Sequence, residues 1–158
     1  FHHDTGQNKF FKRNSRAFPS LGMITLNALT ASDSVIISVQ SHYLSTKGLE
    51  HLLKTIRKVQ RQLNPKLNIE GILFTMTQDR TNFSKEIAEL LKETYGKSIY
   101  IFQYEIPYSI KGAEMRAYGK SIFSFEPNGK IAKAYENLTK EILEIERQRK
   151  KANIDIIR

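Results

Sequence analysis

The sequence contains no cysteine. The chain can therefore form neither disulfide bonds nor thiolate metal sites, and it has no cysteine nucleophile. It also lacks an apolar run close to the roughly 20 residues that a membrane-spanning helix requires, and its first residues do not follow the basic-then-apolar order of a signal peptide. These absences predict a soluble, cytoplasmic protein with no membrane partner.

Acidic side chains are also in short supply. The 16 Asp and Glu residues stand against 25 Lys and Arg, which gives a formal net charge of +9. This imbalance favours a polyanionic partner, because each phosphate neutralised by Lys or Arg releases counterions. Nucleic acid is the leading candidate, and a basic surface that only maintains solubility is the alternative. With 40% hydrophobic and 26% charged residues, the composition is that of a globular domain.

Three short apolar runs, rich in β-branched or aromatic residues, predict buried strands at residues 35–39, 69–76 and 98–102. The first of them, VIISV, is expected to be covered on both faces. Three strands are few for a stable open sheet. Either the sheet is incomplete, or residues 1–34 supply another strand.

Helical patterns follow these strands. Apolar residues recur at three- and four-residue spacing from about residue 45 to 63, over 83–94, and again from about Gly129. Strands that alternate with helices of this length predict an α/β fold with a mainly parallel sheet and flanking helices. The stretch between Pro107 and Gly129 is expected to be irregular.

The two ends of the chain differ from the middle. Residues 1–18 show neither a strand nor a helix period and predict a disordered or unrelated lead-in. The last helix is expected to fray from Glu144 into a basic tail at 151–158. The predicted domain therefore covers residues 19–150.

The sequence offers little for catalysis. Residues 119–121 (GKS) resemble the end of the phosphate-binding pattern GxxxxGK[ST], but Glu114 occupies the position of the first glycine and no other window fits. Asp79 and Glu105 fall on the predicted carboxyl edge of the sheet, yet nothing marks them as an acid-base pair, and no GxSxG nucleophile elbow is present. We predict no catalytic residue and no metal site in this chain.

Five segments in order, with their spacing from Pro19 to Leu143, resemble the second half of the ParA/Soj family of deviant P-loop ATPases, which partition plasmids and chromosomes. The segments are PSLG with TLNAL, VIISVQ, LEHLLKTIRKVQRQLNP, IEGILFTMTQDRTN and EIPYSIKGAEMRAYGKSI. The resemblance implies a partial P-loop NTPase (Rossmann-like) fold and a family that uses ATP and magnesium. It also implies an ATP-bound homodimer, non-specific binding to DNA on the nucleoid, and a ParB-like centromere-binding partner.

The resemblance also implies roles for individual residues. Met76 and Pro107 match positions that contact the adenine, whereas core filling by Met and a stiffened turn at Pro are the ordinary alternatives. Arg80 and Lys111 match basic positions that contact DNA phosphates, and both keep the charge that such a contact requires. The alternative for these two is a solvated surface charge. Gln40 matches a family position whose role is structural or functional.

Departures from the family pattern lie near the amino end. The phosphate-binding Walker A loop of the family precedes the position of Pro19, where this chain has only 18 residues, and Arg16 occupies the place of the magnesium-binding Asp. Phe18 replaces a proline and His42 replaces an acidic residue. We therefore expect a carboxy-terminal fragment with an exposed strand edge, without tight nucleotide binding, that does not hydrolyse ATP alone. The alternative is a nucleotide-independent basic DNA-binding or ParA-interacting module.

Overall fold

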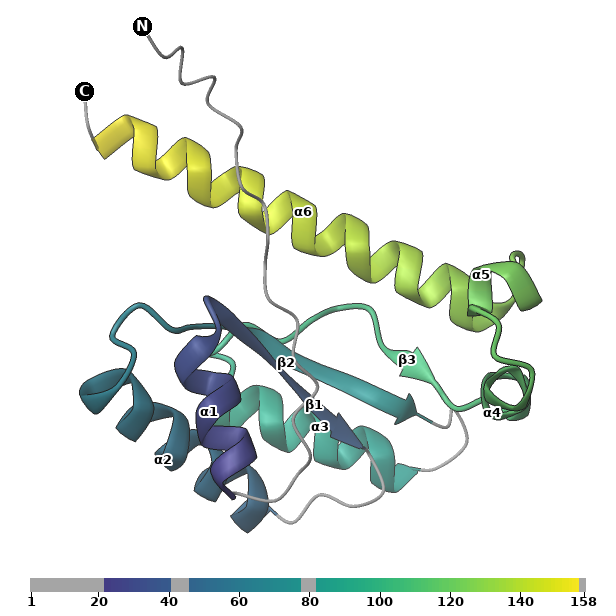
Figure 1. Ribbon diagram of the computed structural model, residues 1–158, viewed down its shortest axis with the longest axis horizontal. Coiled ribbons are helices and arrows are strands. Elements are labelled where there is room, and N and C mark those ends of the chain that lie inside the picture. Colours follow the sequence, from purple (N-terminus) through teal and green to yellow (C-terminus); the bar gives the residue numbers. More distant parts are fainter. Residues whose placement is uncertain (1–21, 41–45, 78–81, 157–158) are drawn as a thin grey trace, which may run out of the picture. The chain divides into compact units, whose positions relative to one another are not determined.

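The computed structural model describes residues 22–40, 46–77 and 82–156. The described elements are helices and strands in alternation over the first two thirds of the chain, followed by helices (Figure 1). In chain order they are α1 (Met23–Ala31), β1 (Ser34–Gln40), α2 (Thr46–Gln62), β2 (Asn68–Thr77), α3 (Asn82–Tyr95), β3 (Ile106–Pro107), α4 (Ile110–Ala117), α5 (Ile122–Phe125) and α6 (Lys130–Ile156). The chain divides into two compact units, of which the first comprises residues 1–35 and 48–69 and the second residues 36–47 and 70–158.

The first unit contains α1 and most of α2. The expected helix over about 45–63 is confirmed as α2, whose buried residues follow the predicted helical spacing. These residues are Leu49, Leu53, Ile56 and Val59. Beyond the end of α2, the side-chain amide of Asn64 donates to the carbonyls of Leu29 (3.2 Å) and Ser32 (2.7 Å) and so ties α1 to this turn.

No additional strand is found among residues 22–33, the described part of the segment suggested as a source of one. Residues Met23–Ala31 form a helix instead. Burial does not follow hydrophobicity along this helix. Met23 and Ile24 are 72% and 70% exposed, whereas Thr25 is buried. Periodicity therefore could not reveal it.

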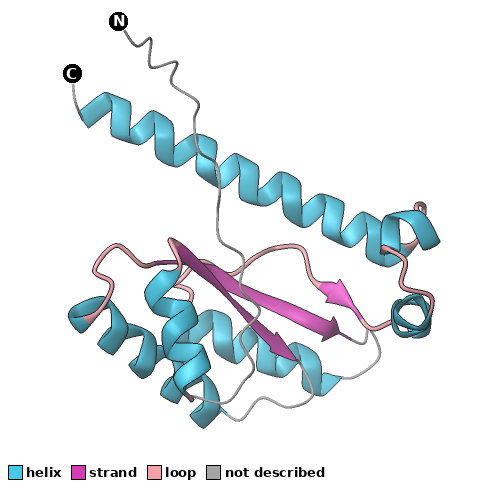
Figure 2. Ribbon diagram, viewed as in Figure 1, coloured by secondary structure: helices cyan, strands magenta, loops and turns pink. Residues whose placement is uncertain are grey.

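The sheet lies mainly in the second unit and has the order β1-β2-β3. β2 pairs with β3 in parallel, and the arrows of β1 and β2 point the same way (Figure 2). The central strand β2 is buried continuously from Glu70 to Phe74. The edge strand β1 is buried only at Ile37 and Val39, with exposed residues between and beside them, so the expectation that this run is covered on both faces is wrong.

The third strand does not lie where the sequence predicted it. Residues 98–102 contribute only an isolated bridge between Ile72 and Ile101, and the short strand β3 follows at Ile106–Pro107. The N–H groups of Ser98 and Ile99 donate to the Tyr95 carbonyl at the end of α3 (2.9 and 2.8 Å), so the first part of this run does not join the sheet, and only Tyr100 and Phe102 bond to Ile72. Beyond the run, Glu141 accepts hydrogen bonds from the backbone N–H groups of Gln103 (2.8 Å) and Tyr104 (3.3 Å), so these groups do not extend the ladder.

The stretch expected to be irregular contains two helices, α4 and α5. Gly112 and Gly119 gave this stretch a low helix propensity in the sequence. Gly119 follows α4 with a positive φ of 60°, as expected for a glycine that ends a helix. Ser121 then caps α5, because its hydroxyl accepts from the backbone N–H of Ser124 (3.2 Å).

The final helix begins at Lys130, as predicted, but continues to Ile156 and does not fray from Glu144. Leu138 of α6 joins a buried cluster with Leu73, Phe102 and Ile106, against which Ala134, Ile142 and Ile145 are packed. Farther along, Arg149 pairs with the buried Glu70 at 2.5 Å. None of the helices in the described part of the chain combines the length and apolarity that a bilayer crossing demands.

Candidate functional site at the carboxyl ends of the strands

Met76 lies at the end of β2 in an unusual backbone conformation. Its φ is 54°, in the left-handed region that a non-glycine residue seldom adopts. The ladder between β2 and β3 is irregular at this point, between Thr75 and Thr77. The Met76 side chain is 40% exposed, so it does not serve to fill the core. Backbone strain of this kind concentrates at functional sites and is a reason to examine this edge.

Pro107 lies opposite, on β3. It is paired in register with Thr77, and the backbone N–H of Tyr108 donates to the Thr77 carbonyl at 3.0 Å. Pro107 is half-buried and Tyr108 is exposed. The fold therefore brings together Met76 and Pro107, the two positions predicted to contact adenine, on neighbouring strand ends. Parallel α/β sheets bind ligands beyond these carboxyl ends.

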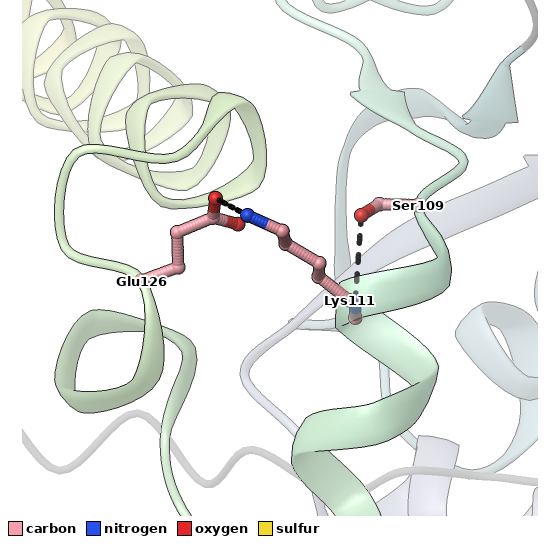
Figure 3. Close-up of polar contacts among 4 residues, drawn as sticks. Ser109, Lys111 and Glu126 are labelled. Atoms are coloured by element: carbon pink, nitrogen blue, oxygen red, sulfur yellow. Dashed lines mark hydrogen bonds and ion pairs between the residues drawn. The ribbon is translucent and has the colours of Figure 1, made fainter.

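Lys111 lies in the first turn of α4, shortly after β3. Its ammonium contacts the carboxylate of Glu126, with 2.5 Å between Nζ and Oε1 (Figure 3). The same turn is capped by Ser109, whose hydroxyl accepts from the backbone N–H of Gly112 at 3.4 Å. The hydrogen bond and the charge of Glu126 raise the pKa of Lys111 above its ordinary value. Lys111 thus remains charged, but a carboxylate already faces that charge.

The position of Glu126 is set by backbone contacts on both sides. Its N–H donates to the carbonyl of Ile122 (2.8 Å), and its own carbonyl accepts from the N–H of Gly129 (3.0 Å). A Cβ added at Gly129 would come within 2.6 Å of Cδ and Oε2 of Glu126. The carboxylate therefore occupies space that a larger residue at position 129 would take.

Sequence reasoning missed Glu126 and Gly129. A signal was present, because Glu126 is the single acidic residue between positions 115 and 135, in a segment with several lysines. Its pairing with Lys111 spans 15 residues and follows no helical or strand period.

Three other places in the sequence, Arg80, Gln40 and residues 119–121, resemble a family position or a binding motif. Arg80 lies outside the described residues. Gln40 is the exposed last residue of β1. The GKS segment at 119–121 forms the turn between α4 and α5 and follows no strand, in agreement with its rejection as a phosphate-binding loop. Within the described ranges, no group of three or more His, Asp or Glu side chains is placed to hold a metal ion.

Comparison with known sequences gives consistent matches. The profile of a family described as "AAA domain" matches residues 17–69. The sporulation initiation inhibitor protein Soj of Bacillus subtilis is 43% identical over 124 residues, which cover 78% of this chain and 48% of that protein. The chromosome partitioning protein ParA of Caulobacter vibrioides is 32% identical over 131 residues, or 83% of this chain and 48% of that one. The chain thus spans about half the length of these curated relatives.

Solved structures with a similar fold include cobyrinic acid a,c-diamide synthase from Mycobacterium smegmatis. With a bound ATP analogue and magnesium, it matches with a TM-score of 0.52 and 35% identity over 58% of this chain and 36% of that chain. With ADP and magnesium, the TM-score is 0.53 at 31% identity, over 65% and 45% of the two chains. The α/β architecture is accordingly a partial P-loop NTPase (Rossmann-like) fold. Because the Soj and ParA relatives align with 78% and 83% of this chain at 43% and 32% identity, the chain belongs to the ParA/Soj family of partition ATPases.

Proposed function

We propose that this chain acts in the ATP-dependent partitioning of DNA, with its second unit supplying contacts to the adenine ring and to DNA phosphates. The proposal rests on relatives that are named as chromosome partitioning proteins. The partners are non-specific DNA, a ParB-like centromere-binding protein and a second copy of the chain, and the location is the nucleoid. These partners follow from family membership alone.

The observation that carries the nucleotide part is the placement of Met76 and Pro107 on the neighbouring ends of β2 and β3. Met76 is turned out of a regular ladder by a left-handed backbone and keeps an exposed thioether. A polarisable thioether and a rigid pyrrolidine ring offer apolar contacts suited to a heteroaromatic ring. Similar solved structures were determined with an ATP analogue or ADP and magnesium.

We propose no residues of this chain as ligands of the triphosphate or of magnesium. The 158 residues contain no GxxxxGK[ST] pattern. Since the described residues contain no cluster of candidate metal ligands, we derive no step through magnesium. ATP hydrolysis by this chain alone is likewise no part of the proposal.

The DNA part rests on Lys111, with Arg80 as the second predicted contact. The Lys111 side chain is 59% exposed and stays protonated at neutral pH. The net charge of +9 supplies the long-range attraction that non-specific binding to DNA requires.

Salt-titrated binding to two unrelated DNA duplexes tests this part. Lys111→Ala and Arg80→Ala should each weaken binding equally for both sequences and reduce the salt slope by about 1. Lys54→Ala is the matched control, because Lys54 is also exposed and paired with a glutamate, at 2.6 Å from Glu50, but lies on α2. Loss of binding in the control to the same extent, or no loss in either test variant, would contradict the assignment.

Crosslinking with a photoreactive adenine nucleotide tests the nucleotide part. Met76→Ala should reduce saturable labelling at least about fivefold, because a thioether contact to the ring is lost. Met23→Ala, at a methionine that is 72% exposed on α1, is the control and should label normally. The absence of saturable labelling of the unaltered chain would count against an adenine site.

A nucleotide-independent DNA-binding or ParA-interacting module is the second candidate. It is favoured by the net charge of +9 and by the exposed ammonium of Lys111, neither of which requires a bound nucleotide. Repeating the DNA titration with and without ATP separates the two functions. Affinity that ignores ATP supports the module, and affinity that rises with ATP supports the partition role.

A further inference from the structure

The predicted DNA contact Lys111 already has an anionic partner in the folded chain. The Nζ atom of Lys111 lies 2.5 Å from Oε1 of Glu126, the geometry of a charge-assisted hydrogen bond. A DNA phosphate would approach the same ammonium. We propose that Glu126 is an intramolecular competitor for Lys111, so that DNA phosphate must displace this carboxylate before Lys111 can bind it. This inference rests on the proposed role of Lys111 in DNA binding.

The exposure of the pair makes such an exchange feasible. The side chains of Lys111 and Glu126 are 59% and 30% exposed, so incoming phosphate has access to the ammonium. Ion pairs at a surface contribute little to stability, since water and salt screen them. A phosphate of the DNA backbone, reinforced by its neighbours, can therefore replace a single carboxylate.

The local fold keeps Glu126 available for Lys111. Residue 126 closes α5 through its bond to the Ile122 carbonyl and leads into α6 through the bond from the Gly129 N–H. The missing side chain of Gly129 leaves the space in which the carboxylate lies. The amino end of the 27-residue helix α6, which carries positive partial charge, also begins directly after Gly129. The carboxylate is thus held at the Lys111 ammonium by its surroundings.

The first test is Glu126→Gln in the full 158-residue chain, which removes the negative charge and keeps the shape of the side chain, with binding to a labelled DNA duplex measured over a range of salt. If Glu126 competes for Lys111, its loss should tighten binding about two- to fivefold, the range expected for an exposed ion pair. The salt slope should change little, because Lys111 contacts the same phosphate in both proteins once the carboxylate has been displaced.

A double-mutant cycle excludes a general effect of removing negative charge. In the Lys111→Ala background, Glu126→Gln should change the affinity less than about 1.5-fold, because no ammonium is left to release. The matched cycle of Glu50→Gln and Lys54→Ala removes the same charges from a pair on α2 and should show no coupling in DNA binding. An equal gain from Glu126→Gln in both backgrounds would overturn the proposal.

A second variant displaces Glu126 without altering any charge. Gly129→Ala places a methyl group where the carboxylate now lies, and the flexible end of Glu126 must move away. It should tighten DNA binding in the same direction as Glu126→Gln, with a circular dichroism spectrum like that of the unaltered chain. Should neither variant tighten binding while Lys111→Ala weakens it, Glu126 is not a competitor. Should Lys111→Ala weaken binding in neither background, the DNA contact itself is refuted.

Discussion

Two carboxylates next to or within α6, Glu126 and Glu141, meet their donors in contrasting ways. Glu141 is 8% exposed and accepts from the Tyr100 hydroxyl (2.7 Å) as well as from two backbone N–H groups. Glu126 has a side chain that is 30% exposed and faces the ammonium of Lys111. The buried carboxylate has neutral donors that are part of the fold. The exposed one has a cation that another anion can reach.

The comparison teaches that burial separates an anchor from a replaceable counter-ion. The loss of Glu141 would break three hydrogen bonds to one buried carboxylate, although Tyr100 and Tyr104 are themselves 41% and 43% exposed. The donor of Glu126 would simply be hydrated or bind phosphate. We therefore expect substitutions at Glu141 to act on folding, and substitutions at Glu126 to act on binding.

The largest effect is expected for Glu141→Ala. It leaves the Tyr100 hydroxyl and the N–H groups of Gln103 and Tyr104 without their acceptor, so the free energy of unfolding should fall by about 3 kcal/mol. Urea unfolding followed by circular dichroism measures the loss. Glu126→Ala, in the same assay, should cost less than about 1 kcal/mol. Equal losses in the two variants would erase the distinction between anchor and counter-ion.

Arg149→Ala should have an intermediate effect. Arg149 pairs with Glu70, whose side chain is 10% exposed, whereas the guanidinium side is 44% exposed. Because solvent screens the Arg149 guanidinium but not the Glu70 carboxylate, the loss in the free energy of unfolding should be about 1 to 2 kcal/mol. Arg147→Ala, an exposed residue on the same helix, is the control. A loss no greater than that of the control would show that the Arg149–Glu70 pair does not anchor the fold and resembles the exposed Lys111–Glu126 pair.

Tyr100 reports on the anchor through its titration. Burial and the hydrogen bond to Glu141 raise the pKa of Tyr100 from its ordinary value of 10.0 to about 12. A raised pKa means that the folded state favours the neutral phenol, so this contribution to stability is complete below pH 10 and is lost as the pH rises towards about 12. Tyr100→Phe should remove this high titration from the tyrosinate absorbance curve and cost about 1 kcal/mol. A difference curve centred near pH 10 would contradict the anchoring bond.

The smallest effect is expected at Glu136, which pairs with Lys140 one turn along α6 at 3.1 Å, with side chains 58% and 69% exposed. Glu136→Ala should change the free energy of unfolding by no more than about 0.5 kcal/mol. This value calibrates the scale for exposed pairs on the same helix. A loss above about 1 kcal/mol would show that the exposure of a carboxylate does not predict its contribution to the free energy of unfolding in this protein.

Much of the fold was predictable because the relevant signals are local. The apolar spacing of α2 and the buried run of β2 read directly from the sequence, and both elements lie within two residues of their expected bounds. The run at 98–102 has strand propensity, but its first residues bond to the Tyr95 carbonyl, and Gln103 and Tyr104 directly after it bond to a carboxylate 38 and 37 residues away in sequence. Propensity carries no information about such a partner.

The candidate site, too, was predictable from the sequence only in part. The positions of Met76, Pro107 and Lys111 came from residue matches to a family. The positive φ of Met76 and its register opposite β3 required coordinates, because a methionine gives no sequence signal for a left-handed backbone.

The sequence by itself determined the charge, the alternation of strands and helices, and the family, since these depend on residue type and near-neighbour spacing. Only the tertiary structure decided which carboxylate meets which donor. Lys111 and Glu126 are 15 residues apart and Tyr100 and Glu141 are 41 apart, and such pairs form only when the path of the chain brings them within hydrogen-bond distance. That path is set by the packing of whole elements, and no local pattern encodes it.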